Sequence, residues 1–200
     1  MSHAWQEGSL VASAPPVAGP LVVKVGGSLL TRPDWAAGLA ALLEPLTAPL
    51  LIVVGGGPLV DALRAIDARS PQPAAVMHEL AIDTMGVTAR LVAAALGVPL
   101  VIDAPRRDAE APIAVLDAPA WLRHGGRLAV LPVGWHVTSD SIAAFVASRC
   151  GGRLLLVKSV PPPIADLTSL GEAGWVDRYF PTASLPLTSI AWAAPTRVAP

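Results

Sequence analysis

The fold is decided by residues 21–28, LVVKVGGS, and by a second stretch of the same kind at residues 50–58, LLIVVGGGP. Each begins as a short run of branched apolar side chains and ends in glycines, which is typical of a strand buried inside a sheet. Helical segments are expected at 34–46 and at 58–69, where Pro58 suits the first turn. The chain therefore alternates strand and helix from residue 21 onward.

The same alternation continues over most of the chain. Residues 138–141, TSDS, form a cluster of good helix caps before a helical segment that runs to Arg149. Apolar strands that alternate with helices are typical of the α/β class, with a mainly parallel sheet covered by helices on both faces. We expect further helices at 74–96 and 119–123, and further strands at 99–102, 127–131, 154–157 and 189–193.

The composition predicts a folded domain with a large core. Of 200 residues, 53% are hydrophobic and 14% charged, and the formal net charge is −1. This balance excludes a generally basic nucleic-acid-binding protein and a polybasic membrane-surface protein. Residues 1–20 are rich in proline, alanine and glycine without a period, so we expect a flexible N-terminal arm there and a single domain at 21–200.

Membrane insertion and secretion have little support in the sequence. The longest apolar run, 91–102, is far shorter than the roughly 20 residues that span a bilayer. The only cysteine, Cys150, cannot form an intrachain disulfide and is expected to be a small buried apolar residue. No lysine or arginine precedes Lys24, so the N-terminus lacks the charged start of a secretory signal. We therefore expect a cytoplasmic location, with no nucleic-acid or membrane partner.

The lysines indicate the chemistry. Twelve of the 14 basic residues are arginines, and the two lysines, Lys24 and Lys158, both lie at the ends of expected strands. In parallel sheets, ligands bind at the carboxyl ends of the strands. Lysine supplies a compact point charge where arginine supplies a planar fork, so both lysines are candidates for charge stabilisation at one crevice.

Two glycine-rich turns follow the strands that lead toward this crevice. Glycine lets backbone N–H groups approach an anion without a Cβ in the way, although a tight turn between strand and helix needs glycine equally. Two such turns and two lysines suit phosphoryl transfer, which depends on positioning and charge stabilisation. Asp140 is placed to hold both ammonium groups; the alternative is an acidic residue favoured by the helix dipole.

The motifs KVGGS, GGGPLVD and TSDSIAA, in this order over residues 21–159, resemble the amino acid kinase superfamily. The resemblance implies a three-layer αβα sandwich with a mainly parallel central sheet. It also implies ATP-dependent phosphorylation of a carboxylate, a carbamate or a phosphate, with Mg²⁺ held through the nucleotide phosphates. Carried onto this chain, the catalytic residues are Lys24, Asp140 and Lys158, the nucleotide-phosphate glycines are Gly26 and Gly27, and the acceptor-binding glycines are Gly55, Gly56 and Gly57. Beside these positions we expect Ser28 and Ser159 to bind the nucleotide, and His136 and Ser139, close to Asp140 in the chain, to bind the acceptor.

A narrower resemblance rests on the chain's size, the helix at 77–96 and the stretch 135–140, WHVTSD. These are similar to the small (aminomethyl)furanylmethyl-phosphate kinases of methanofuran-type cofactor biosynthesis and to relatives in tetrahydromethanopterin-using bacteria. The resemblance implies a small phosphomonoester as acceptor and a homodimer as the working form.

One departure from the family pattern leaves alternatives open. Residues 160–163, VPPP, stand where many members have an acidic residue and a glycine near the nucleotide. A non-catalytic, regulatory or anion-binding member of the fold is therefore one alternative, and a kinase with a carboxylate or carbamate acceptor is another. His78 is read as a core histidine or as a wall of the acceptor site.

Overall fold

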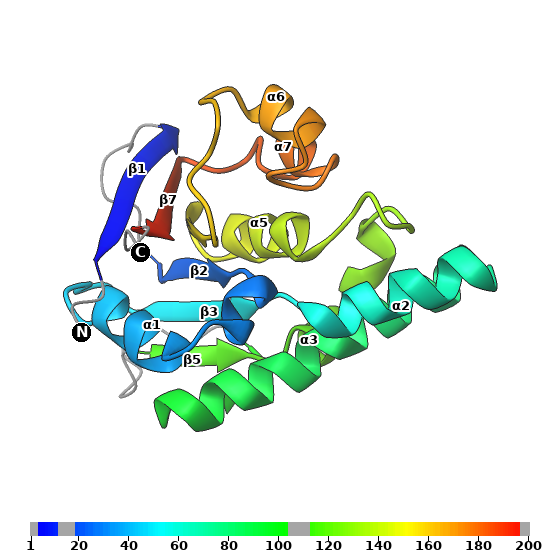
Figure 1. Ribbon diagram of the computed structural model, residues 1–200, viewed down its shortest axis with the longest axis horizontal. Coiled ribbons are helices and arrows are strands. Elements are labelled where there is room, and N and C mark those ends of the chain that lie inside the picture. Colours follow the sequence, from blue (N-terminus) through cyan, green and yellow to red (C-terminus); the bar gives the residue numbers. More distant parts are fainter. Residues whose placement is uncertain (1–3, 12–18, 104–112, 197–200) are drawn as a thin grey trace.

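A sheet of parallel strands with one antiparallel edge organises the molecule (Figure 1). The structure, a computed structural model, describes residues 4–11, 19–103 and 113–196. Within these ranges the sheet has seven strands in the order β1-β7-β6-β2-β3-β5-β4, and only β1 runs antiparallel to its neighbour β7. The strands are β1 (Trp5–Val11), β2 (Leu21–Val25), β3 (Leu50–Val54), β4 (Leu100–Val101), β5 (Ile113–Leu116), β6 (Arg153–Val157) and β7 (Ser189–Pro195).

Helices cover both faces of the sheet, as expected for the α/β class. Figure 1 shows α5 on one side of the central strands and α1 with α3 on the other. The fold class predicted from the sequence is confirmed. The helices are α1 (Trp35–Leu43), α2 (Pro58–Arg69), α3 (Ala74–Leu96), α4 (Ala118–Arg123), α5 (Ser139–Arg149), α6 (Leu167–Glu172) and α7 (Phe180–Ala183), with 3-10 turns η1 (Gly27–Thr31) and η2 (His124–Val130).

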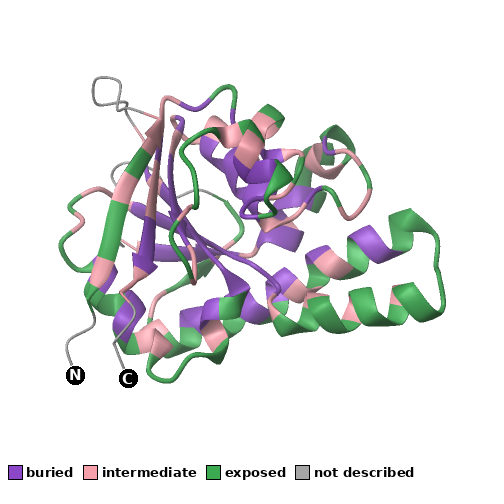
Figure 2. Cartoon of the chain, turned by 45° about the horizontal axis from the view of Figure 1, so that its top comes forward, coloured by how far each residue is buried: buried purple, intermediate pink, exposed green. Residues whose placement is uncertain are grey.

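The period of two along each strand divides the core into two clusters. In β2, Val22 packs with α5, whereas Val23 and Val25 pack with α1 and α3. In β6, Leu154 and Leu156 share the α5 face. Figure 2 shows these central strands buried and the outer end of the α2–α3 hairpin largely exposed.

The prediction of a strand at 127–131 is wrong. Residues 127–130 form the second half of η2, after Gly125 and Gly126 with positive φ angles of 65° and 71°, and Leu131 follows the end of this element. Leu128 and Leu131, three residues apart, contact the core, while Val130 is 60% exposed. The apolar residues thus follow a helical spacing, and the strand that pairs with β3 is instead β5, which the sequence analysis did not predict.

Part of the expected N-terminal arm also differs from its prediction. Residues 5–11 form β1, which pairs with β7 almost the whole chain length away. Gly8 lies against the ring of Trp192, where a Cβ would approach the indole nitrogen to 2.6 Å. β1 is only partly buried and pairs with a strand that is distant in the chain, so the local sequence has no alternation of apolar residues that would predict it. A single domain at 21–200 stays a prediction.

Among the described residues, no helix is both long enough and apolar enough to cross a lipid bilayer. The cytoplasmic location and the homodimer stay predictions.

Candidate active site

Three strand ends meet at the centre of the sheet. β2 lies between β3 and β6 and is parallel to both. The N–H of Gly26 donates to the carbonyl of Val157 at 2.8 Å, and the N–H of Gly55 donates to the carbonyl of Val25 at 2.9 Å. The two glycine turns and the segment that carries Lys158 are therefore side by side.

Lys24, Asp140 and Lys158 form one chain of charges at this point. Lys24 Nζ lies 2.7 Å from Asp140 Oδ1, and Lys158 Nζ lies 2.7 Å from Asp140 Oδ2. The side chains of Lys24, Asp140 and Lys158 are 5%, 6% and 13% exposed. Lys158 also donates to the carbonyl of Trp175 at 2.6 Å and lies 5.1 Å from the centre of that indole ring.

The period of two explains why both lysines reach the same carboxylate. Lys24 follows Val22 by two residues, and Lys158 follows Leu156 by two, so each extends the row of side chains that faces α5. Asp140 lies in the first turn of α5. The alternation of side chains along β2 and β6 and the position of the first turn of α5 thus bring together three residues that are far apart in the chain.

Burial and pairing act in opposite directions on the ionisation of this cluster. Burial raises the pKa of Asp140, but the positive charges of Lys158 and Lys24 outweigh it and lower the pKa to about 2. Burial lowers the pKa of Lys158 to about 8, because the attraction of Asp140 offsets only part of the desolvation. At neutral pH the carboxylate is therefore ionised and Lys158 still carries its proton.

The start of α5 is held by a residue that the sequence analysis missed. Asp177 Oδ2 accepts from the N–H of Thr138 at 3.0 Å, from its hydroxyl at 2.8 Å and from the N–H of Ser141 at 3.0 Å. The Ser141 hydroxyl donates to the other carboxylate oxygen. This carboxylate caps the helix from outside and so positions Asp140. In the sequence, Asp177 was only an acidic residue in a segment expected to be irregular, and nothing nearby predicted that it would cap α5.

The glycines of the two turns are required by close packing as well as by the site. A Cβ on Gly27 would lie 2.2 Å from the nitrogen of Gly57, and Gly57 itself has a φ of 57°. A Cβ on Gly56 would lie 2.1 Å from the hydroxyl of Thr84. Close packing therefore accounts for these glycines. The same turns line a cavity, and their role in binding an anion stays a prediction.

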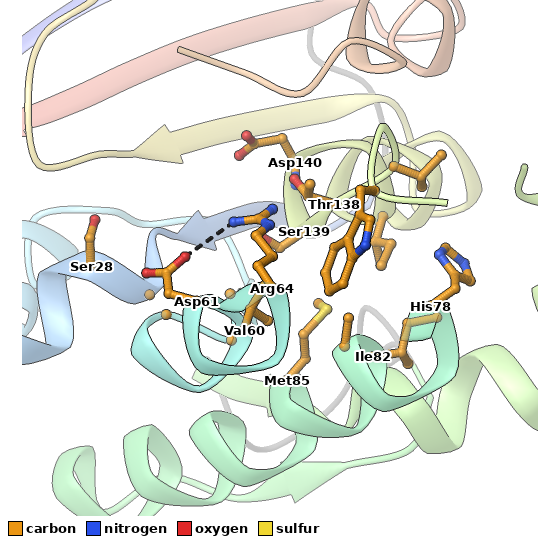
Figure 3. Close-up of a pocket in the computed structure, with 18 of the residues that line it drawn as sticks. Ser28, Val60, Asp61, Arg64, His78, Ile82, Met85, Thr138, Ser139 and Asp140 are labelled. Atoms are coloured by element: carbon orange, nitrogen blue, oxygen red, sulfur yellow. Dashed lines mark hydrogen bonds and ion pairs between the residues drawn. The ribbon is translucent and has the colours of Figure 1, made fainter. Parts of the chain in front are cut away.

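This glycine-side cavity has a volume of about 210 Å³ and opens beside Asp140 (Figure 3). Its rim carries Arg64, which is paired with Asp61 at 3.2 Å and stacks 5.2 Å from the ring centre of Trp135. Trp135 is fixed by donating from Nε1 to Asp67 at 2.7 Å. Polar and apolar groups both line it, and its aliphatic side chains are Val60, Ala81, Ile82, Met85, Val137 and Ile142.

A second, more open cavity of about 500 Å³ lies on the other side of Asp140. This Lys158-side cavity is lined by Lys158, His136, Trp175 and Arg178, among others. Asp140 lines both cavities, as do Arg64, Trp135 and Thr138.

The remaining predicted site residues lie around the same three strand ends. Ser28 and Ser139 line the glycine-side cavity, and the Ser28 hydroxyl donates to that of Ser159 at 3.4 Å. Gly26 pairs with the end of β6, as described above. His136, which was expected to contact the acceptor together with the glycines, instead lines the Lys158-side cavity.

His78 and Cys150 differ in their relation to the site. Cys150 packs against the core behind α5, and burial raises the pKa of its thiol to about 11. His78 is 5% exposed and lines the glycine-side cavity. Its Nδ1 accepts from the N–H of Gly134 at 3.4 Å.

The site contains little that would hold a metal by itself. In the parts of the chain that the structure describes, no group of three or more His, Cys, Asp or Glu side chains is arranged around a common point. Both oxygens of Asp140 contact lysines, and both oxygens of Asp177 accept hydrogen bonds from the start of α5.

Comparison with known proteins agrees with this geometry. A family model described as the amino acid kinase family matches residues 19–162. The structure is similar to a UMP kinase from Ureaplasma parvum, with a TM-score of 0.56 and 14% identity over 84% of each chain. It also matches a uridylate kinase from Archaeoglobus fulgidus, with a TM-score of 0.49 and 15% identity over 74% of this chain and 69% of that one. No curated protein matches the sequence. At 14% identity, the Ureaplasma parvum structure shows a shared fold alone.

Proposed function

This chain belongs to the amino acid kinase family, and on that premise we propose that it transfers the γ-phosphoryl group of ATP to a small phosphomonoester. Membership of the family supports a kinase-type phosphotransferase. The observation that carries the proposal is the buried chain Lys24–Asp140–Lys158, which stands where two cavities meet. Two cations held at fixed positions between a donor and an acceptor suit the transfer of a negatively charged group.

The transfer is direct and in line. An oxygen of the acceptor phosphate forms a bond to the γ-phosphorus of ATP, while the bond from that phosphorus to the bridging oxygen breaks. ADP leaves with the electron pair. The attacking phosphate is already a dianion, so the step needs no general base. Lys24, on the glycine-side cavity, and Lys158, on the other, stabilise the negative charge that is shared by donor and acceptor.

We assign the nucleotide to the Lys158-side cavity and its phosphates to the first glycine turn. Lys158, Ser159, Gly26, Gly27 and Ser28 would hold the phosphates. Because Gly27 and Ser28 line the glycine-side cavity, the γ-phosphoryl group would then point toward the acceptor in that cavity. The larger volume of that cavity and its cations, Arg178 among them, support this assignment. Mg²⁺ fits as a partner of the phosphates, because the acidic side chains next to the site are already paired; when bound, it would neutralise part of the phosphate charge.

We assign the acceptor to the glycine-side cavity. Its phosphate would lie near Lys24, the second glycine turn and Ser139, with Arg64 available at the rim. The aliphatic side chains on its wall support a compact organic group as the body of the acceptor, such as a phosphomonoester of methanofuran-type or tetrahydromethanopterin-linked cofactor biosynthesis. His136 would contact the donor, since it lines the other cavity.

The test is a panel of acceptors with ATP–Mg²⁺, scored by ADP release. We expect turnover with small phosphomonoesters and loss of at least 10³-fold in kcat for Lys24→Ala, with an unchanged circular dichroism spectrum. Turnover with carboxylates or carbamate alone would overturn the choice of acceptor. Calorimetry that detects no ATP–Mg²⁺ binding at millimolar concentration would instead support a non-catalytic member of the family.

A further inference from the structure

Helix α3 leaves a stripe of large apolar side chains exposed on its outer face. Four side chains form this α3 stripe and are between 41% and 52% exposed: Val76, Leu80, Val87 and Leu91. Separations of four and seven residues keep them on one face of the helix. A contiguous apolar stripe marks an interaction surface, whereas single exposed apolar residues need no explanation.

The spacing of the α3 stripe is the same in both directions along the helix. The separations are four, seven and four residues, and their centre lies between positions 83 and 84. A second α3 that lies antiparallel across a two-fold axis at this centre would pair Val76 with Leu91 and Leu80 with Val87, in both halves of the contact. An unrelated partner would need no such symmetry, so the spacing favours a second copy of this chain.

The charged residues beside the stripe are arranged in the same way. Glu79, Asp83 and Arg90 lie along one flank of it. A two-fold axis across the helices keeps this flank on one side and reverses its direction. Glu79 then comes opposite position 88 of the second copy, two residues or about 3 Å from Arg90 along the helix, which is within reach of these long side chains.

The monomer leaves these two charges available and protects the one near the axis. In the described part of the chain, neither Glu79 nor Arg90 forms a salt bridge. Asp83, which lies nearest the axis, is paired with Arg123 at 2.6 Å. The contact therefore brings two pairs of opposite charges together, and the two Asp83 carboxylates that approach each other are already neutralised.

The ends of the hairpin enlarge the contact beyond the stripe. From position 76 to 91 the stripe is about 22 Å long and 10 Å wide, which covers less than the roughly 800 Å² that each partner of a stable dimer buries. The same pairing places the exposed turn at 71–73 of the second copy opposite residues 94–96 (Figure 2). There a groove of about 600 Å³, lined by Ala41 and Leu96 among others, opens between α1 and α3.

We propose that two copies of this chain associate through antiparallel α3 helices, across a two-fold axis that passes between positions 83 and 84. The apolar pairs supply the affinity, and the Glu79–Arg90 pairs fix the direction. The inference is independent of the proposed transfer, and it assigns a surface to the homodimer that the sequence only led us to expect. Ile82 and Met85, which line the glycine-side cavity, lie on the opposite face of α3, so the contact itself does not cover that cavity.

Sedimentation equilibrium of the full chain tests the association. We expect the wild-type protein to have twice its mass of 20.5 kDa at about 100 µM. Val87→Glu buries a charge on each side of the contact and should raise the dissociation constant at least 100-fold. Leu185→Glu is the matched control, because Leu185 is 80% exposed between α7 and β7, across the sheet from α3 (Figure 1). A monomeric wild-type protein, or equal dissociation constants for the two variants, overturns the proposal.

Exchange of the two charges tests the direction of the helices. Glu79→Arg and Arg90→Glu should each raise the dissociation constant about tenfold, because each places like charges together. The double variant restores opposite charges and should return to within about threefold of wild type. A double variant as weak as the product of the two single effects would show that the helices do not pair in this antiparallel register.

A single cysteine tests the position of the axis. Asp83→Cys places two thiols at the two-fold axis, so mild oxidation should give a disulfide-linked dimer. Ile66→Cys, at a position that is 55% exposed on α2 of the same hairpin, should not, and both variants retain Cys150 as a common background. Equal crosslinking of the two variants overturns the assigned axis.

Discussion

Replacing Lys158 by Met should make the protein more stable and inactive. The folded state lowers the pKa of Lys158 from 10.5 to about 8, because desolvation exceeds the attraction of Asp140. At about 1.4 kcal/mol for each tenfold change in proton affinity, keeping this side chain charged at pH 7 costs about 3 kcal/mol. Met fills a similar volume without that cost, and Asp140 is not left as an unpaired buried charge, because Lys24 Nζ stays 2.7 Å from its Oδ1. The site therefore retains a destabilising cation for its chemistry.

The size of this stabilisation depends on pH in a way that identifies its cause. Between about pH 8 and 10.5 the folded state releases the Lys158 proton while the unfolded state keeps it. The unfolded state then binds more protons, so the contribution of Lys158 to stability rises with pH in this window. Lys158→Met lacks that rise. The advantage of the variant should be full at pH 7 and should disappear by about pH 10.5.

Urea denaturation followed by tryptophan fluorescence measures this difference. At pH 7 we expect the free energy of unfolding of Lys158→Met to exceed that of wild type by about 3 kcal/mol, or roughly 6–12 °C in Tm. Arg123→Met is the control, since Arg123 is 46% exposed in its ion pair with Asp83 and should change stability by less than about 1 kcal/mol. A Lys158→Met protein that is less stable than wild type at pH 7, or an advantage that does not change with pH, would refute the reasoning.

Three further substitutions probe the rest of the site. Asp140→Asn leaves two buried ammonium groups without their carboxylate, so we expect a loss of about 3–5 kcal/mol in urea denaturation and no measurable transfer; stability within 1 kcal/mol of wild type would contradict the ion-pair geometry. Asp177→Ala removes the cap of α5 and should lower kcat at least tenfold, whereas Asp166→Ala, which removes the exposed cap of α6, should cost about 1 kcal/mol and leave kcat unchanged. Equal kcat in those two variants would show that Asp177 does not position the site. Gly27→Ala places a Cβ 2.2 Å from the backbone of the other glycine turn and should abolish activity or folding, but Gly125→Ala, where the Cβ meets open space, should cost only about 1 kcal/mol because of its positive φ; a fully active Gly27→Ala protein would refute the close packing of the turns.

Strong local patterns were sufficient for the elements around the site. The bounds of β2, β3, α2 and α3 agree with the sequence prediction, because a buried branched run before glycines and a long amphipathic run have few alternatives. Local patterns failed where tertiary contacts decide the conformation. Residues 127–131 have the composition of a strand, yet the two preceding glycines and the contacts of Leu128 and Leu131 with the core make them helical.

The site shows the same division. That two lysines lie at strand ends is visible in the sequence, and so is a carboxylate in the first turn of a capped helix. Their contact through one carboxylate depends on the order of β2 and β6 in the sheet, which no local pattern contains. The cap that Asp177 provides was harder to predict. Asp177 lies in a segment that was expected to be irregular, 36 residues from Ser141 in the chain.

The sequence alone determined the class of fold, the strand ends that carry charge and the chemistry that suits them, because these follow from residue type and short-range periodicity. Only the tertiary structure decided that both ammonium groups share one carboxylate, that two cavities adjoin it, and that His136 and His78 line different ones. Those relations depend on strand order and on the direction in which each side chain leaves its element, and both are set by packing between segments that are distant in the chain.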